Sequence, residues 1–167
     1  MKSLCVAAGL AAVLLSACAS YSGGSLIAGV STTADVEALM GKPAERAEKS
    51  GGGSVFYYPR GPVGRETYAV LIGADGKVQG VEQRLTDANI GKLVLGTTTV
   101  REVRELFGPP AATTHFARLE RDIWEYPMEP YYMPYVLYVH FSADGIVREV
   151  FKMSDYKADP YMGSLPY

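Results

Sequence analysis

The chain has few of the side chains on which catalytic and metal-binding sites are commonly built. Its 167 residues include two cysteines and two histidines. His115 and His140 stand in no His-Glu-x-x-His or similar spacing, no Gly-x-Ser-x-Gly motif occurs, and no Gly-Lys-Ser/Thr follows the glycines at 51–53. The two Asp-Gly pairs lack the regularly spaced carboxylates of a calcium-binding loop. We therefore expect a protein that is not an enzyme and that binds no metal or cofactor.

An excess of charge and long apolar runs are lacking too. The net charge of -2 gives no general electrostatic reason to bind nucleic acid or an anionic membrane surface. The apolar run at 4–15 is too short to cross a bilayer, and one basic residue, Lys2, precedes it. This is the form of a secretory signal peptide, so we expect residues 1–17 to be removed.

The end of that segment, "LSAC" at 15–18, resembles the lipobox of bacterial lipoproteins. The resemblance implies cleavage by signal peptidase II between Ala17 and Cys18, and a mature Cys18 that carries a diacylglycerol and an N-acyl chain such as palmitate. More than one acyl chain anchors a protein stably without crossing the membrane. Because Ala19 rather than Asp follows the cysteine, the resemblance implies the periplasmic face of the outer membrane. The alternative is an ordinary signal peptide that ends in a cysteine by chance.

The mature chain is then expected to have no free thiol. Cys5 leaves with the signal peptide and Cys18 is acylated, so no disulfide can form within the chain and its core must stabilise it alone. The stretch 18–26 includes the Gly- and Ser-rich "YSGGSL". We predict that it is a flexible tether between the lipid and a folded body.

The rest of the chain contains an internal repeat. The segment "GVSTTADVEALMGKP" from Gly29 aligns without a gap with "GTTTVREVRELFGPP" from Gly96. Further along, "VFYYP" matches "IWEYP", and "GADGKVQGV" matches "SADGIVREV". We predict a first repeat at 27–86, a second repeat at 87–155 and an irregular tail at 156–167.

Each repeat is expected to start with a short helix. Thr32 or Thr33, and Thr98 or Thr99, supply N-cap oxygens, and a glycine with a proline close behind it suits each helix end. Strand-like runs follow at 54–58, 67–72 and 77–83, then at 121–126, 135–141 and 146–152, with an Asp-Gly hairpin turn before the last run of each repeat. The predicted fold class is α+β: two tandem repeats, each a short helix packed on an antiparallel β-meander.

This order resembles the outer-membrane lipoprotein family that contains BamE (SmpA/OmlA), a component of the β-barrel assembly machinery. The shared signature is a Gly-x-Thr start, a Val-x-x-Leu-hydrophobic-Gly-x-Pro helix end, an aromatic strand and a final hairpin, and it occurs twice here. The tandem arrangement is also similar to the β-lactamase inhibitor protein, although that family's disulfides are absent. The resemblance implies a non-catalytic protein-interaction module in outer-membrane protein assembly or envelope integrity, with an envelope protein such as the assembly machinery as partner. The alternative is an inhibitor or sequestering protein.

The two repeats differ most in the loop after the aromatic strand. The first copy reads "RGPVGR", small and basic, whereas the second reads "MEPYYMP", aromatic and rich in thioethers. Strict alternation in "YVLYVHF" places three residues with the core and leaves Tyr138 on the opposite face. Tyr and Met are enriched at protein interfaces. The candidate interface residues are therefore Met128, Tyr131, Tyr132, Met133 and Tyr138. The alternative is that this loop packs on the first repeat and closes the contact between the two repeats, which we call the joint.

Overall fold

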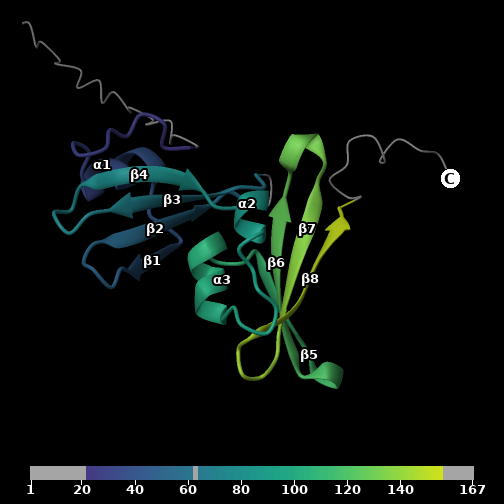
Figure 1. Ribbon diagram of the computed structural model, residues 1–167. Coiled ribbons are helices and arrows are strands. Elements are labelled where there is room, and N and C mark those ends of the chain that lie inside the picture. The colour runs from purple at the N-terminus through teal and green to yellow at the C-terminus, as the bar shows by residue number, and fades with distance from the viewer. Residues whose placement is uncertain (1–21, 62–63, 156–167) are drawn as a thin grey trace, which may run out of the picture.

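The computed structural model describes residues 22–61 and 64–155 (Figure 1). Within them, eight strands form two separate four-stranded antiparallel sheets, ordered β1-β2-β3-β4 and β5-β6-β7-β8. No helix in these ranges is long and apolar enough to span a membrane. The predicted signal peptide, the processing site at Ala17 and Cys18, and the tail at 156–167 lie outside the described residues.

The elements follow one another in nearly the same order in both halves. The first half contains α1 (Thr33–Met40), β1 (Glu45–Glu48), β2 (Ser54–Pro59), β3 (Thr67–Ile72) and β4 (Val78–Gln83). The second half contains α2 (Asp87–Ile90), α3 (Val100–Phe107), β5 (Ala112–Phe116), η1 (Ala117–Leu119), β6 (Arg121–Met128), η2 (Pro130–Tyr132), β7 (Tyr135–Phe141) and β8 (Val147–Ser154).

The predicted α+β class of helix-on-meander repeats is wrong. The described chain is mostly β, and none of its α-helices exceeds eight residues. Each sheet has a fourth strand, β1 or β5, that the sequence pattern did not reveal because neither strand alternates apolar and polar residues: β1 reads Glu-Arg-Ala-Glu, and every residue of β5 is exposed. In addition, α3 lies between the two sheets and contacts both halves (Figure 1), so the halves are not self-contained helix-and-sheet units.

Local signals at the helix starts are confirmed. Thr32 and Thr99 are the N-caps, and each accepts a hydrogen bond from the backbone N–H three residues on, at Asp35 or Glu102. The two carboxylates accept in return from the threonine N–H groups, at 2.8 and 2.7 Å. These reciprocal bonds lower the pKa of both carboxyl groups. The six predicted strands are also present, and β7 alternates buried and half-buried residues along its whole length.

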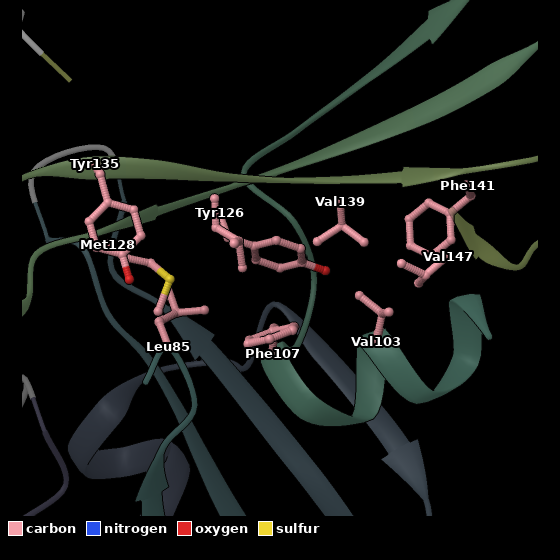
Figure 2. Close-up of a cluster of buried hydrophobic side chains, with 10 residues drawn as sticks. Leu85, Val103, Phe107, Tyr126, Met128, Tyr135, Val139, Phe141 and Val147 are labelled. Carbon is pink, nitrogen blue, oxygen red and sulfur yellow. The ribbon is translucent and has the colours of Figure 1, made fainter. Parts of the chain in front are cut away.

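Each sheet has its own apolar core on the side of the helix that precedes it. In the first core, Val36 and Met40 of α1 pack with residues of β2, β3 and β4. In the second core, Val103 and Phe107 of α3 pack with residues of β6, β7 and β8 (Figure 2). The second core comprises Leu85, Val103, Phe107, Tyr126, Met128, Tyr135, Leu137, Val139, Phe141 and Val147. Leu26, which the sequence placed in the tether, packs against the first core.

A repeated tyrosine ties each sheet to the end of its helix. The Tyr58 hydroxyl donates to the Gly41 carbonyl at 3.1 Å, and the Tyr126 hydroxyl donates to the Gly108 carbonyl at 3.2 Å. Burial raises the pKa of both phenols, that of Tyr58 to about 12. Both hydroxyls therefore remain donors at neutral pH.

The first sheet is covered on its second face as well, by α3. Val55, Tyr57 and Ala69 form a buried cluster on the face away from α1, and the Tyr57 hydroxyl donates to the Glu105 carbonyl at 3.4 Å. Next to it, the guanidinium Nε of Arg104 donates to the Glu45 carboxylate at 2.7 Å. No described helix lies over the corresponding face of the second sheet (Figure 1). One part of the joint between the halves is thus built from one face of the first sheet and one side of α3.

Candidate interaction site

The β6–β7 hairpin ends in an exposed tip, residues 129–133, which we call the hairpin tip. The side chains of Tyr131, Tyr132 and Met133 are 90%, 91% and 71% exposed. Pro130 begins the single turn of η2, and the Met133 N–H donates to the Pro130 carbonyl at 3.1 Å. Tyr131 and Tyr132 have φ angles of 54° and 62°, in the left-handed region that residues with a side chain rarely adopt. The tip therefore presents two neighbouring aromatic side chains on a backbone conformation that costs about 1–3 kcal/mol per residue.

The base of the hairpin tip is buried, unlike its end. Met128 and Tyr135 pair at the end of the β6–β7 ladder, and both lie in the second core beside Leu85 (Figure 2). Met128 is only 1% exposed. It is therefore a core residue and does not belong to the interface in which the sequence placed it.

A charged network holds this base in position. The Lys152 ammonium donates to the Asp87 carboxylate at 2.6 Å, and the Tyr135 hydroxyl donates to the same oxygen at 3.2 Å. The bond from Lys152 is the main reason that the pKa of Asp87 is lowered, and the same bond raises the pKa of Lys152. The start of α2 is thereby tied to β7 and β8.

Arg65, from the β2–β3 loop of the first half, connects that half to the base of the hairpin across the joint. Its side chain is 8% exposed, and its guanidinium donates to the Asp155 carboxylate at 2.6 Å and to the Tyr135 carbonyl at 3.3 Å. The carboxylate of Glu129 lies 3.8 Å away. The joint is thus sealed by Arg65 together with the buried base of the hairpin, while the hairpin tip itself stays exposed.

A polar pocket of about 620 Å³ lies beside the hairpin tip. Arg65 and Glu66 of the first half, Asp87 at the start of α2, and Glu129 and Tyr131 of the tip are among the residues that line it. The tip and the pocket together give a protruding aromatic surface next to a depression. This shape and composition suit a partner that packs on the tyrosines and inserts a polar side chain beside them.

Tyr138 lies on the sheet face away from α3, apart from the hairpin tip. Its ring stacks on Phe151 with the centroids 5.1 Å apart, and the same phenylalanine meets the His140 ring edge-on at 5.1 Å. Burial raises the pKa of Tyr138 and lowers that of His140. His140 Nε2 has no hydrogen-bond partner among the described residues. These rings form an aromatic row on the open face of the second sheet.

The sequence did not reveal the polar residues of the joint. Besides Arg104 and Glu45, the buried Asn89 donates to the carbonyls of Arg84 and Leu106 at 2.9 and 3.1 Å. These partners are far apart along the chain or belong to the unpredicted helix α2, so no spacing rule connects them. The described residues contain no cluster of three or more His, Cys, Asp or Glu side chains that could hold a metal ion.

Comparisons with known proteins assign this chain to no family. Neither the family models nor the curated proteins provide a match to this chain. One solved structure to which the chain is similar is a DUF4309 family protein (YjgB) from Bacillus subtilis subsp. subtilis str. 168. The two are 16% identical, the alignment covers 78% of this chain and 83% of that one, and the TM-score is 0.32. A likeness at that TM-score supports no statement about the fold or the function of this chain.

Proposed function

We propose that this chain is an outer-membrane-anchored periplasmic lipoprotein that binds another envelope protein through the hairpin tip. The observation that carries the proposal is the near-complete exposure of Tyr131 and Tyr132 on a left-handed backbone. Exposed aromatic side chains in a conformation that disfavours folding are expected where they serve a contact outside the chain.

The chemistry of the hairpin tip supports this role. Tyrosine carries a large apolar area and a polar hydroxyl on only two rotatable bonds, so little conformational entropy is lost when it is bound. Met133 adds a flexible thioether that adapts to irregular surfaces. Arg65 and the buried base of the hairpin keep the tip in a defined position, which lowers the cost of ordering it on binding.

The lipobox supports the location of the partner. In this proposal Cys18 anchors the chain, and the resemblance to the BamE family suggests a partner in the β-barrel assembly machinery. Replacing Cys18 with Ser should leave an unprocessed precursor and remove the protein from the outer-membrane fraction of a Gram-negative cell. Normal fractionation of the Cys18→Ser variant would refute the anchor while leaving the hairpin-tip proposal standing.

Photo-crosslinking from the hairpin tip tests the interaction. A photoreactive amino acid in place of Tyr132 in the full chain is expected to capture one envelope protein, and the added change Tyr131→Ser should reduce that capture at least about tenfold. The matched control is Leu119→Ser, which removes a 60% exposed apolar side chain from η1 and should leave capture unchanged. Equal loss in both variants, or no specific product, would exclude the tip as the binding surface.

A stability measurement separates binding from folding in the same variants. Glycine adopts the φ angles of Tyr131 and Tyr132 without strain, so Tyr131→Gly should leave the free energy of unfolding unchanged or raise it by up to about 1 kcal/mol, while abolishing capture. A loss of several kcal/mol would show instead that the tyrosine supports the fold.

The protruding shape of the hairpin tip also favours a second candidate, an inhibitor whose tip enters the pocket of a target enzyme. The same crosslinking experiment distinguishes the two. Capture of an enzyme at its active site, with loss of that enzyme's activity in the presence of the purified chain, would identify the inhibitor. Capture of a membrane-assembly component would support the adaptor.

A further inference from the structure

The two sheets have four edge strands, and β5 is the least protected of them. The edges at β4 and β8 are each distorted by a bulge, seen as a register shift against β3 and β7. The edge at β1 carries charges, and its Glu45 and Arg46 pair with side chains of α3 and α1. By contrast, β5 pairs with β6 in unbroken register, and its five residues, Ala-Thr-Thr-His-Phe, are all exposed and include no Lys, Arg, Asp, Glu or Pro.

An edge strand presents a row of unpaired backbone N–H and C=O groups to which another strand can add. Charges, proline and bulges are the usual means of preventing such pairing, and β5 has none of them. It is the outer strand of its sheet, pairs with β6 on one side and with no described strand on the other, and each of its residues is exposed. The first half of the chain provides the internal contrast, since the equivalent strand β1 is charged and tied to two helices.

We propose that β5 pairs antiparallel with β5 of a second copy of this chain, around a two-fold axis at Thr114. The pairing would join two four-stranded sheets into one of eight strands. Thr114 would lie opposite Thr114 of the second copy, and Ala112 opposite Phe116. The contact is isologous, so both copies use the same surface and the assembly closes as a dimer.

The side chains of β5 favour a second copy over the alternatives. Self-pairing of β5 sets no like charges opposite one another, whereas self-pairing of β1 would set Glu45 opposite Glu48. Opposed threonines are a favourable cross-strand pair. Phe116 is 45% exposed, and the small Ala112 opposite it leaves room for its ring. A five-residue strand buries less area than a standard interface, so we expect a weak dimer, which anchoring on one membrane would strengthen by raising the local concentration.

The test is the oligomeric state of the full chain in mild detergent, measured by analytical ultracentrifugation over a range of concentrations. Wild type is expected to dimerise reversibly. Thr114→Lys and Thr114→Glu should each weaken the dimer at least about fivefold, because each puts two like charges opposite one another. The matched control is Ala74→Lys in the exposed β3–β4 turn, which should leave the dimer unchanged.

Mixing the two charged variants makes the test specific for β5. An equal mixture of Thr114→Lys and Thr114→Glu should dimerise at least as well as wild type, while circular dichroism shows that each variant keeps its sheets. A monomer at every concentration, a dimer that Thr114→Lys does not affect, or a mixture that stays monomeric would each overturn the proposal. A dimer that Tyr131→Ser weakens and Thr114→Lys leaves intact would also overturn it, by assigning self-association to the hairpin tip.

Discussion

The two halves of the chain share a local plan but use their helices differently. Helix α1 packs on one sheet, whereas α3 packs on its own sheet and also covers a face of the first. The change needs few residues: Arg104 stands where α1 has Glu37, and it binds Glu45 of the first half. The two helices thus present the same side to their own cores, and α3 has a second contact surface on its outer side.

Alanine substitutions of the glycines that end α1 and α3 should show the largest difference in stability between the two halves. Gly41 and Gly108 have φ angles of 82° and 78°, with ψ near 180°, a region almost restricted to glycine, so alanine should cost about 1–3 kcal/mol at either position. At Gly108 an added Cβ would also lie 2.8 Å from the Tyr57 ring and 3.0 Å from the Thr67 methyl group, whereas at Gly41 it would meet nothing within 4 Å. Gly108→Ala should therefore cost about 1–3 kcal/mol more than Gly41→Ala in urea unfolding. Equal costs would show that α3 does not press on the first sheet.

The buried tyrosines should make the stability of both halves sensitive to alkali. Because the folded-state pKa values of Tyr58 and Tyr126 lie above the usual value near 10, the unfolded chain loses its phenolic protons first as the pH rises. Their contribution to stability is complete below about pH 10 and is lost as the pH rises through the folded-state pKa, which for Tyr58 is about 12.

Single Tyr-to-Phe variants measure how much each tyrosine contributes to stability and to its pH dependence. Tyr58→Phe and Tyr126→Phe should each cost about 1 kcal/mol at pH 7, through the lost hydrogen bond to Gly41 or Gly108. Each should also flatten the fall in unfolding free energy above pH 10. A wild-type curve that is flat from pH 9 to 12 would contradict the assignment.

The ion pair between Arg104 and Glu45, which crosses the joint, should make the smallest difference to the free energy of unfolding. A double-mutant cycle with Arg104→Ala and Glu45→Ala should give a coupling free energy of about 1 kcal/mol, because the pair is partly buried and bidentate. The matched cycle on Arg46 and Glu37, a more exposed pair within the first half, should give about 0.3 kcal/mol. A joint pair no stronger than its exposed counterpart would mean that the Arg104–Glu45 pair contributes little to holding the halves together.

Features that depend on a few neighbouring residues could be predicted from the sequence. The N-caps at Thr32 and Thr99 and six of the strands follow from local spacing and propensity, and the structure confirms them.

Features that depend on distant parts of the chain could not be predicted in this way. The edge strands β1 and β5 have no buried face of their own, and the second contact surface of α3 exists only because the first sheet lies against it. Both omissions contributed to the wrong fold class. Composition alone also could not divide the aromatic loop into a buried base and an exposed tip.

The strand position of Pro127 accounts for the boundary between the buried base and the exposed tip of the aromatic loop. The strand-like run in the sequence ends at residue 126, yet β6 continues through Pro127 to Met128. The ladder with β5 has already ended at the pair Ala112–Glu125, so Pro127 lies opposite only Val136 of β7 and needs no N–H toward β5. The strand therefore reaches far enough to bury Met128 and to carry the tyrosines beyond the core.

The position of α3 also sets the order in which parts of the chain can fold during synthesis. A chain made from its N-terminus presents the first sheet before α3 exists, so Val55, Tyr57 and Ala69 remain uncovered while the polypeptide is extended from β3 to Phe107. At ordinary rates of synthesis this interval lasts on the order of seconds. The first half can bury this face only when α3 arrives, and during that interval the uncovered apolar cluster is open to aggregation.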